Sequence, residues 1–353
     1  MRVQRVRFNF LFLFMLFLIS ILSLFGQIDV SGYLETRPLI AWNNSVNIYG
    51  YNRGWLEFKT SGLNYGTQIA FNCIVQYDTT HIVNILENIN VSRLMLWLGP
   101  ENLRITAGKQ RLYWGVAKVF RPLDVFNPIN FFEPGYERPG TNAILGYLSV
   151  GRLTSLRGIY LPQHNFKKSL LGLRIGTNLY KNDIGLNFIH KPSDLKRIVG
   201  FEVTGDLILG YWGEFSYTWE DSAQYGKASL GCDYTFSFPL YSMVEFFYDG
   251  NGENNPQKYD ITKIISGERV TLARQYLYIS IGWVHDPFFR PSINSVINLN
   301  DRGIILIPRI YYSIFENTEL TFGLNYFLGP NSSEFRVISS FDGQAYIWAR
   351  VYF

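Results

Sequence analysis

The last ten residues alternate strictly between polar and apolar side chains, and this pattern constrains the fold more than any other feature of the chain. Residues two apart point to the same face of a β-strand, so the pattern predicts a strand with one apolar and one polar face. A chain made of such strands must shield one face of each, either in packed sheets or in a sheet that closes on itself. The apolar face would carry Ala345, Ile347, Ala349, Val351 and Phe353, and the polar face Gln344, Tyr346, Trp348, Arg350 and Tyr352.

The same alternation recurs along the chain and predicts about 18 strands, an even number that lets an antiparallel barrel close with both chain ends on one side. If the weakest segment, at 292–299, is not a strand, the count falls to about 16. The predicted strands are at about 28–35, 51–60, 65–77, 88–99, 103–107, 142–150, 153–162, 171–175, 183–190, 201–204, 215–219, 226–237, 240–248, 273–285, 292–299, 303–314, 318–327 and 344–353.

The cost of exposing charge to lipid decides which face points outward. A lysine or arginine on the lipid side near the bilayer midplane costs about 2–4 kcal/mol, so the apolar set must face lipid and the polar set must line the interior. The composition, with 17% aromatic and 17% charged residues, suits a membrane barrel but also a soluble β-sandwich. The pattern therefore predicts an all-β fold, a transmembrane antiparallel β-barrel, with Tyr211, Trp219, Trp283 and Tyr312 at the membrane interfaces.

The N-terminal sequence has the features of a secretory signal peptide. Three arginines, Arg2, Arg5 and Arg7, precede an apolar run from Phe8 to Phe25, and this order is typical of a signal peptide. We predict a signal over residues 1–26 and a single barrel over residues 27–353, although a run this long could also stay as a membrane anchor. Removing the signal lowers the net charge from +4 to about +1, so we expect no nucleic-acid partner.

Connections between the predicted strands alternate between short and long. Membrane barrels have short periplasmic turns and longer outer loops, so the long segments at about 78–87, 111–141, 249–270 and 328–342 should lie on the outer side. The segment 111–141 is the third outer loop in this count, and it carries charges of both signs and four prolines. We expect it to fold into the lumen and either constrict or plug the barrel.

Charged residues of the inward set are predicted to line the pore. The arginines come from earlier strands than the glutamates, which suggests a transverse field across a narrow lumen. The alternative is that these charges pair with their neighbours on the wall. The predicted pore-lining residues are Arg93, Arg104, Arg157, Arg174, Glu202, Glu214 and Glu245.

A family resemblance rests on the segment that follows the fifth strand. Its signature is Gly108-x-Gln110, Trp114-Gly115, Arg121-Pro122, Asp124 and Asn127-Pro128. It resembles a group of porin-like bacterial outer-membrane β-barrels, related in style to the alginate-export and carbohydrate-selective porins. The resemblance implies an outer-membrane location, a diffusion or uptake channel, and a constriction shaped by Gln110, Trp114, Arg121, Asp124 and Asn127. The C-terminal Phe353 is similar to the signal that the barrel-assembly machinery reads.

Three classes of function follow from this pattern. The first is a passive porin for small polar or charged solutes, set in outer-membrane lipid. The second is a plugged barrel with a structural or surface-glycan-binding role. The third, a barrel-embedded enzyme, is not favoured: the four histidines, His81, His164, His190 and His285, lack the spacing of a metal motif, so we expect no catalytic residues, no metal and no cofactor. The sequence leaves the oligomeric state and the solute open.

Overall fold

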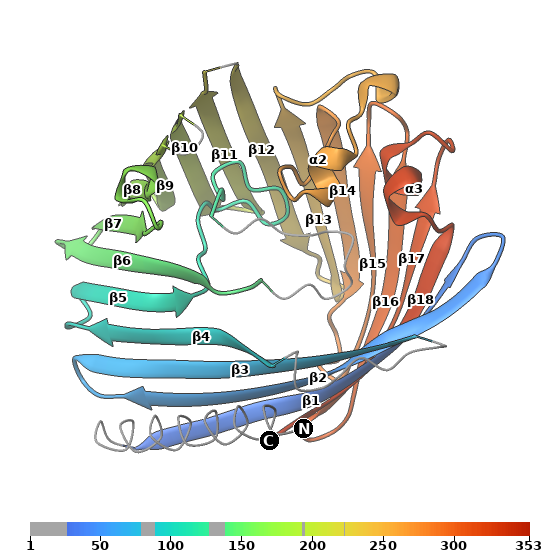
Figure 1. Cartoon of the computed structure of the whole chain (residues 1–353), viewed down its shortest axis with the longest axis horizontal. Helices are drawn as coiled ribbons and strands as arrows, with labels where there is room; N and C mark the ends of the chain where they lie inside the picture. The colour runs from blue at the N-terminus through green and yellow to red at the C-terminus, as the bar shows by residue number, and fades with distance from the viewer. Residues whose placement is uncertain (1–26, 79–88, 127–137, 193–194, 222) are drawn as a thin grey trace.

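The chain forms one closed barrel of 18 antiparallel strands in the residues that the computed structural model describes, which are 27–78, 89–126, 138–192, 195–221 and 223–353. Each strand pairs with the next, and β1 pairs with β18 to close the sheet (Figure 1). The predicted fold and the count of 18 are confirmed, and the weak segment is a strand, Phe289–Asn298. The signal predicted over 1–26 lies outside the described residues.

The strands differ in length from 8 to 16 residues. They are β1 (Ile28–Trp42), β2 (Val46–Ser61), β3 (Tyr65–Asp78), β4 (Ile89–Leu98), β5 (Leu103–Gln110), β6 (Thr141–Val150), β7 (Thr154–Leu161), β8 (Leu170–Leu179), β9 (Asn182–Lys191), β10 (Lys196–Asp206), β11 (Gly210–Trp219), β12 (Gln224–Thr235), β13 (Leu240–Asp249), β14 (Gln275–Trp283), β15 (Phe289–Asn298), β16 (Ile304–Phe315), β17 (Thr318–Leu328) and β18 (Gly343–Tyr352). Short helices are η2 (Phe166–Lys168), η4 (Pro256–Lys258), α2 (Thr262–Ile265) and α3 (Glu334–Ser339).

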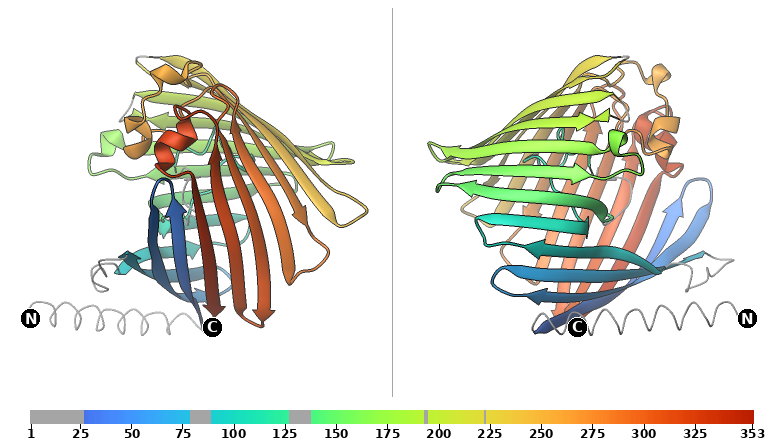
Figure 2. Two further views of the ribbon diagram at one scale, coloured as in Figure 1. Left: turned by 90° about the vertical axis from the view of Figure 1, so that its right-hand side faces the viewer. Right: turned by 60° about the vertical axis from the view of Figure 1, so that its left-hand side comes forward.

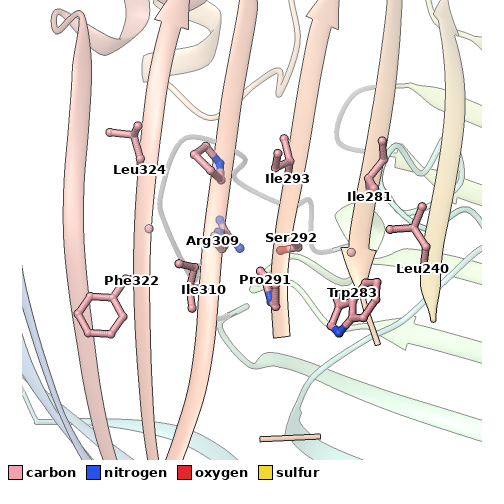
Figure 3. A pocket seen from close by; sticks show the side chains of 13 residues that line it. Leu240, Ile281, Trp283, Pro291, Ser292, Ile293, Arg309, Ile310, Phe322 and Leu324 are labelled. Carbon is pink, nitrogen blue, oxygen red and sulfur yellow. The ribbon is translucent and has the colours of Figure 1, made fainter. Parts of the chain in front are cut away.

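The alternation separates an apolar outer wall from a polar lumen. Ile293 of β15 pairs with Ile281 of β14, and both side chains are about half exposed on the outside. This wall has a shallow apolar hollow of about 510 Å³ across β13 to β17, where Leu240, Trp283 and Phe322 stand on its rim (Figure 3). Such an apolar face suits contact with lipid tails. No helix among the described residues is long and apolar enough to cross a membrane.

The two ends of the barrel carry different connections. At one end, the short-turn mouth, strands are joined by turns such as 62–64, 180–181 and 316–317. At the other, the long-loop mouth, the connections include 111–140, 250–274 and 329–342, and the last two carry α2 and α3 (Figure 2). This alternation matches the predicted one, so the long-loop mouth is the outer side of a barrel of this kind.

Candidate pore constriction

The segment 111–126 leaves β5 and turns into the barrel, where it lies against the inner wall (Figure 1, teal). Gln110, the last residue of β5, is buried, and its side-chain Nε2 donates to the carbonyl of Ala143 on β6 over 3.1 Å. This bond ties the start of the loop to the wall. Trp114 is also buried and packs edge-on against Phe126, with their ring centroids 5.2 Å apart. Gln110 and Trp114 therefore hold the ends of the described loop in place.

The underside of the loop packs on apolar side chains that face the lumen. Leu123 is fully buried and reaches β10 at Gly200, where a Cβ would come within 2.2 Å of its methyl group. The glycine leaves the room that Leu123 occupies. Further along, Phe120 stacks on Phe247 of β13 with centroids 4.9 Å apart. The largest of the clusters under the loop contains Leu112, Trp114, Leu123, Phe126, Ala143, Ile159, Leu161, Leu170, Ile189 and Ile198.

A wall glutamate, Glu214 of β11, anchors the loop by its main chain. Its Oε2 accepts from the N–H groups of Val116 (2.8 Å) and Ala117 (2.9 Å), and its Oε1 accepts from that of Leu123 (2.6 Å). Gly115 has a positive φ of 85°, and a Cβ there would lie 2.3 Å from Glu214 Oε2. Only glycine lets the backbone approach the carboxylate so closely.

A second wall glutamate, Glu245 of β13, repeats this arrangement. It accepts from the N–H groups of Lys118 (2.9 Å), Val119 (3.2 Å) and Phe120 (2.6 Å), and from the indole Nε1 of Trp212 (2.7 Å). The side chains of Glu214 and Glu245 are almost fully buried. Both glutamates therefore face inward, as predicted, but the loop covers them and they line no open part of the lumen.

The charges of the loop itself mainly hold its shape. Asp124 is buried and its Oδ2 forms an ion pair with Arg138 at 2.6 Å. Arg121 donates from Nε to the carbonyl of Ala117 over 2.7 Å, and one of its terminal nitrogens lies 3.9 Å from Asp124 Oδ2. Asn127, the fifth predicted constriction residue, lies outside the described residues. Within 111–126 the exposed side chains are Tyr113 and Lys118, and neither is among the five predicted constriction residues.

The wall charges pair with close neighbours on the barrel. Arg174 of β8 lies 2.5 Å from Glu202 of β10, and Arg93 of β4 lies 3.3 Å from Glu57 of β2. The expected transverse separation of charge is therefore wrong for Arg174 and Glu202, because strands two apart in a sheet bring their inward side chains together. Glu214 accepts from loop amides, so the glutamates predicted to form the acidic side of a transverse field are bonded to other groups of the protein.

A hollow of about 450 Å³ lies between the loop and the wall of β5 to β7, and its charged lining is dominated by arginine. Arg104 pairs in register with Tyr147, Tyr147 with Arg157, and Arg157 with Arg174. Like charges directly opposite in a sheet repel each other. The hollow is lined by Glu101, Arg104, Arg111, Leu112, Tyr113, Trp114, Leu145, Tyr147, Arg157 and Ile159.

Arg104 and Arg157 lack a carboxylate partner within 4.0 Å in the part of the chain that the structure describes. Within the same part, the buried Nε of Arg104 and the buried indole Nε1 of Trp114 have no hydrogen-bond acceptor. A buried donor without an acceptor is costly, so this hollow favours an anion or another acceptor as its occupant. The described residues hold no cluster of side chains that could bind a metal.

A closed antiparallel barrel with a long loop packed inside its lumen is the architecture of the outer-membrane porins, and this chain has that fold. Among solved structures it is similar to OccK9 (OpdG) of Pseudomonas aeruginosa, with a TM-score of 0.64 and 8% identity over 93% of this chain and 98% of that one. The expected outer-membrane location agrees with these neighbours.

Two further structures show how far the likeness extends. The outer membrane protein opdK of Pseudomonas aeruginosa gives a TM-score of 0.62 at 7% identity, covering 93% of this chain and 98% of that one. OmpF of Salmonella typhi, in complex with daunomycin, gives 0.51 at 9% identity, covering 92% and 97%. No family model and no curated protein matches the sequence. The carbohydrate-selective style of the signature around Gln110 and Trp114 stays a prediction.

Proposed function

We propose that the protein is a porin-like channel of the outer membrane that passes small polar solutes and favours anions. The observation that carries this proposal is that two acidic side chains of the lumen are bonded to the loop, whereas two of its arginines are not paired with a carboxylate among the described residues. Glu214 and Glu245 are buried under the loop and bonded to it, whereas Arg104 and Arg157 have no carboxylate partner among the described residues. The net charge that the hollow beside the loop presents to a passing solute is therefore positive, with Glu101 as its acidic member.

Side chains on the loop strengthen this positive field. Lys118 is exposed to the lumen and lies 5.5 Å from the ring centroid of Trp212. Arg111 lines the same hollow as Arg104 and Arg157. A narrow passage with low-dielectric walls focuses such charges and raises the local concentration of ions of opposite sign.

The arginines also suggest which anions the channel favours. A guanidinium presents a planar fork of N–H donors that matches a carboxylate or a phosphate, which a halide ion cannot exploit in the same way. Passage would be diffusion of a hydrated solute past these groups. It requires no bond to be made or broken, and no cofactor takes part.

Ion selectivity of the refolded protein tests this proposal. We expect reversal potentials in a salt gradient across a planar bilayer to show a preference for anions. The double variant Arg104→Gln and Arg157→Gln should lose most of that preference, while Arg152→Gln, in an exposed turn at the short-turn mouth, should keep it. A cation-selective channel, or a double variant with the selectivity of the native protein, would refute the anion preference.

The tight packing of the loop favours a second candidate, a plugged barrel with a structural or glycan-binding role. Leu123 and Phe120 are buried against the wall, and six loop amides are bonded to two carboxylates. A barrel closed in this way would give no stable conductance steps in the same bilayers. Steady open channels would exclude it.

A further inference from the structure

Three connections meet at the long-loop mouth around one buried carboxylate, that of Glu334. It is the first residue of α3, in the connection 329–342, and lies beside the turn 299–303 and the end of the connection 250–274. Figure 2 shows α2, in the connection 250–274, and α3 at the same end of the barrel. The side chain of Glu334 is about 1% exposed, although it belongs to a loop.

Each oxygen of Glu334 accepts from a different part of this mouth. Oε1 accepts from the N–H of Leu272 over 2.8 Å. Oε2 accepts from the hydroxyl of Tyr276 over 2.5 Å and from the side-chain amide of Asn298 over 2.7 Å. One carboxylate therefore joins α3 to the connection 250–274, to β14 and to the end of β15.

A second carboxylate, that of Asp301, is buried beside the first. Its Oδ2 accepts from the N–H of Glu334 over 2.8 Å and from the amide of Asn298 over 2.9 Å. The same Asn298 nitrogen thus donates to both carboxylates, which brings two groups of the same charge close together. Two neighbouring carboxylates out of contact with water resist ionising together.

The groups that face this pair supply little positive charge. Tyr276 comes from β14, and Tyr259, from the connection 250–274, places its hydroxyl 3.3 Å from Asn298 Nδ2. Arg302, which follows Asp301 in the chain, is exposed. Arg274 donates to the carbonyl of Gly252 and Arg336 to Asp342. Within the described ranges, no lysine, arginine or histidine lies within 4.0 Å of either carboxylate in an ion pair.

We propose that Glu334 and Asp301 form a proton-dependent latch that holds the connections 250–274, 299–303 and 329–342 together while the pair keeps one proton, and releases them when both carboxylates ionise. This device goes beyond solute passage and does not depend on the proposed selectivity. Its effect would be to loosen the long-loop mouth at alkaline pH.

The direction of the pH dependence follows from burial. Loss of hydration, with a smaller contribution from the charge of Asp301, outweighs the hydrogen bonds from Tyr276, Leu272 and Asn298, which lower the pKa, and raises the pKa of Glu334 to about 7. Burial also raises the pKa of Asp301. A carboxyl whose pKa is higher in the folded state stabilises that state fully below its ordinary pKa and loses this contribution as pH rises through the raised value. The latch should therefore weaken progressively as pH rises from about 5 to about 7, by on the order of a few hundredfold in total in the ratio of closed to open loops.

A spin label on α3 reports this change directly. Val337 is 39% exposed on the helix, so Val337→Cys can carry the label in the whole protein after Cys73 and Cys232 are changed to alanine. We expect the label to be immobile at pH 5.5 and to become mobile with a midpoint near pH 7. Glu334→Gln, which cannot ionise, should show no change of label mobility with pH in this range, and Glu316→Gln, in a turn at the short-turn mouth, should behave as the native residue does.

Either of two results would overturn the latch. One is a label whose mobility does not change with pH in the protein with native Glu334. The other is a transition near pH 7 that persists in Glu334→Gln. Circular dichroism of each variant at pH 5.5 establishes that the barrel is folded, so that loss of the transition is not mistaken for loss of the fold.

Discussion

Removing the two carboxylates under the loop is the most direct perturbation of the candidate constriction. Glu214 accepts from three loop amides and Glu245 from three loop amides and the Trp212 indole. In the double variant Glu214→Gln and Glu245→Gln, each side chain keeps its size but replaces one acceptor oxygen by an NH₂ group. At each site an NH₂ then faces a loop N–H, and the loop should leave the wall.

The size of the effect can be worked out from these contacts. A buried N–H that loses its acceptor costs about 1–3 kcal/mol, and each remaining bond loses about 1 kcal/mol when its acceptor is no longer charged. A neutral side chain avoids the cost of burying a charge, which offsets part of this loss. Taking about 2 kcal/mol for each glutamate, the docked loop loses about 4 kcal/mol, which corresponds to several hundredfold in its docking equilibrium.

Two measurements check this expectation. Single-channel recordings should show larger and noisier conductance, and trypsin should cut after Lys118 in the folded barrel once the loop is released; the bond after Arg121 resists trypsin because Pro122 follows it. The matched control is Glu202→Gln, because Glu202 is as deeply buried but pairs with Arg174. If the double variant keeps native conductance and resists trypsin, the carboxylates do not hold the loop.

Further substitutions test the loop contact and the two faces of the wall. Gly115→Ala should also release the loop, because its Cβ would meet Glu214 Oε2 at 2.3 Å and the positive φ of 85° strains any other residue; trypsin cleavage of the folded barrel checks this. Ile293→Arg, on the outer wall, should destabilise the barrel in lipid by about 2–4 kcal/mol. Ser292→Arg, at the preceding residue, which faces the lumen, should cost much less. Urea midpoints of the two proteins in vesicles measure this difference, and equal midpoints would contradict the assignment of the faces.

The barrel itself could be predicted from the sequence because alternation is a local signal. Each strand reports its own two faces, and even the weak segment around Ile293 and Val296 keeps an outer and an inner set. Segment ends were harder to predict: β1 continues to Trp42 through Pro38, and at that proline the alternating pattern is interrupted. Local patterns therefore gave the number and order of the strands better than their lengths.

The constriction could be predicted only in part. The length and position of the loop indicated that it enters the lumen, and Gln110 and Trp114 do lie where it leaves the wall. Its anchors are different in kind, because Glu214 and Glu245 bind backbone amides, and a backbone amide has no signature in the sequence. The pairing of Arg174 with Glu202 likewise depends on the register between strands, which alternation does not specify.

The main-chain anchoring has a consequence for how such a channel can diversify. Glu214 and Glu245 accept from N–H groups, which every residue except proline supplies, so the exposed side chain at 118 can change without moving the loop, whereas the buried Ala117 and Phe120 are fixed by packing. Lys118, which faces the lumen, could be exchanged for an acidic, neutral or aromatic residue while the aperture stays where it is. The main chain thus fixes the position of the loop, while the side chain at 118 sets its charge and polarity. A small library of substitutions at 118 would give channels of equal width that prefer different solutes.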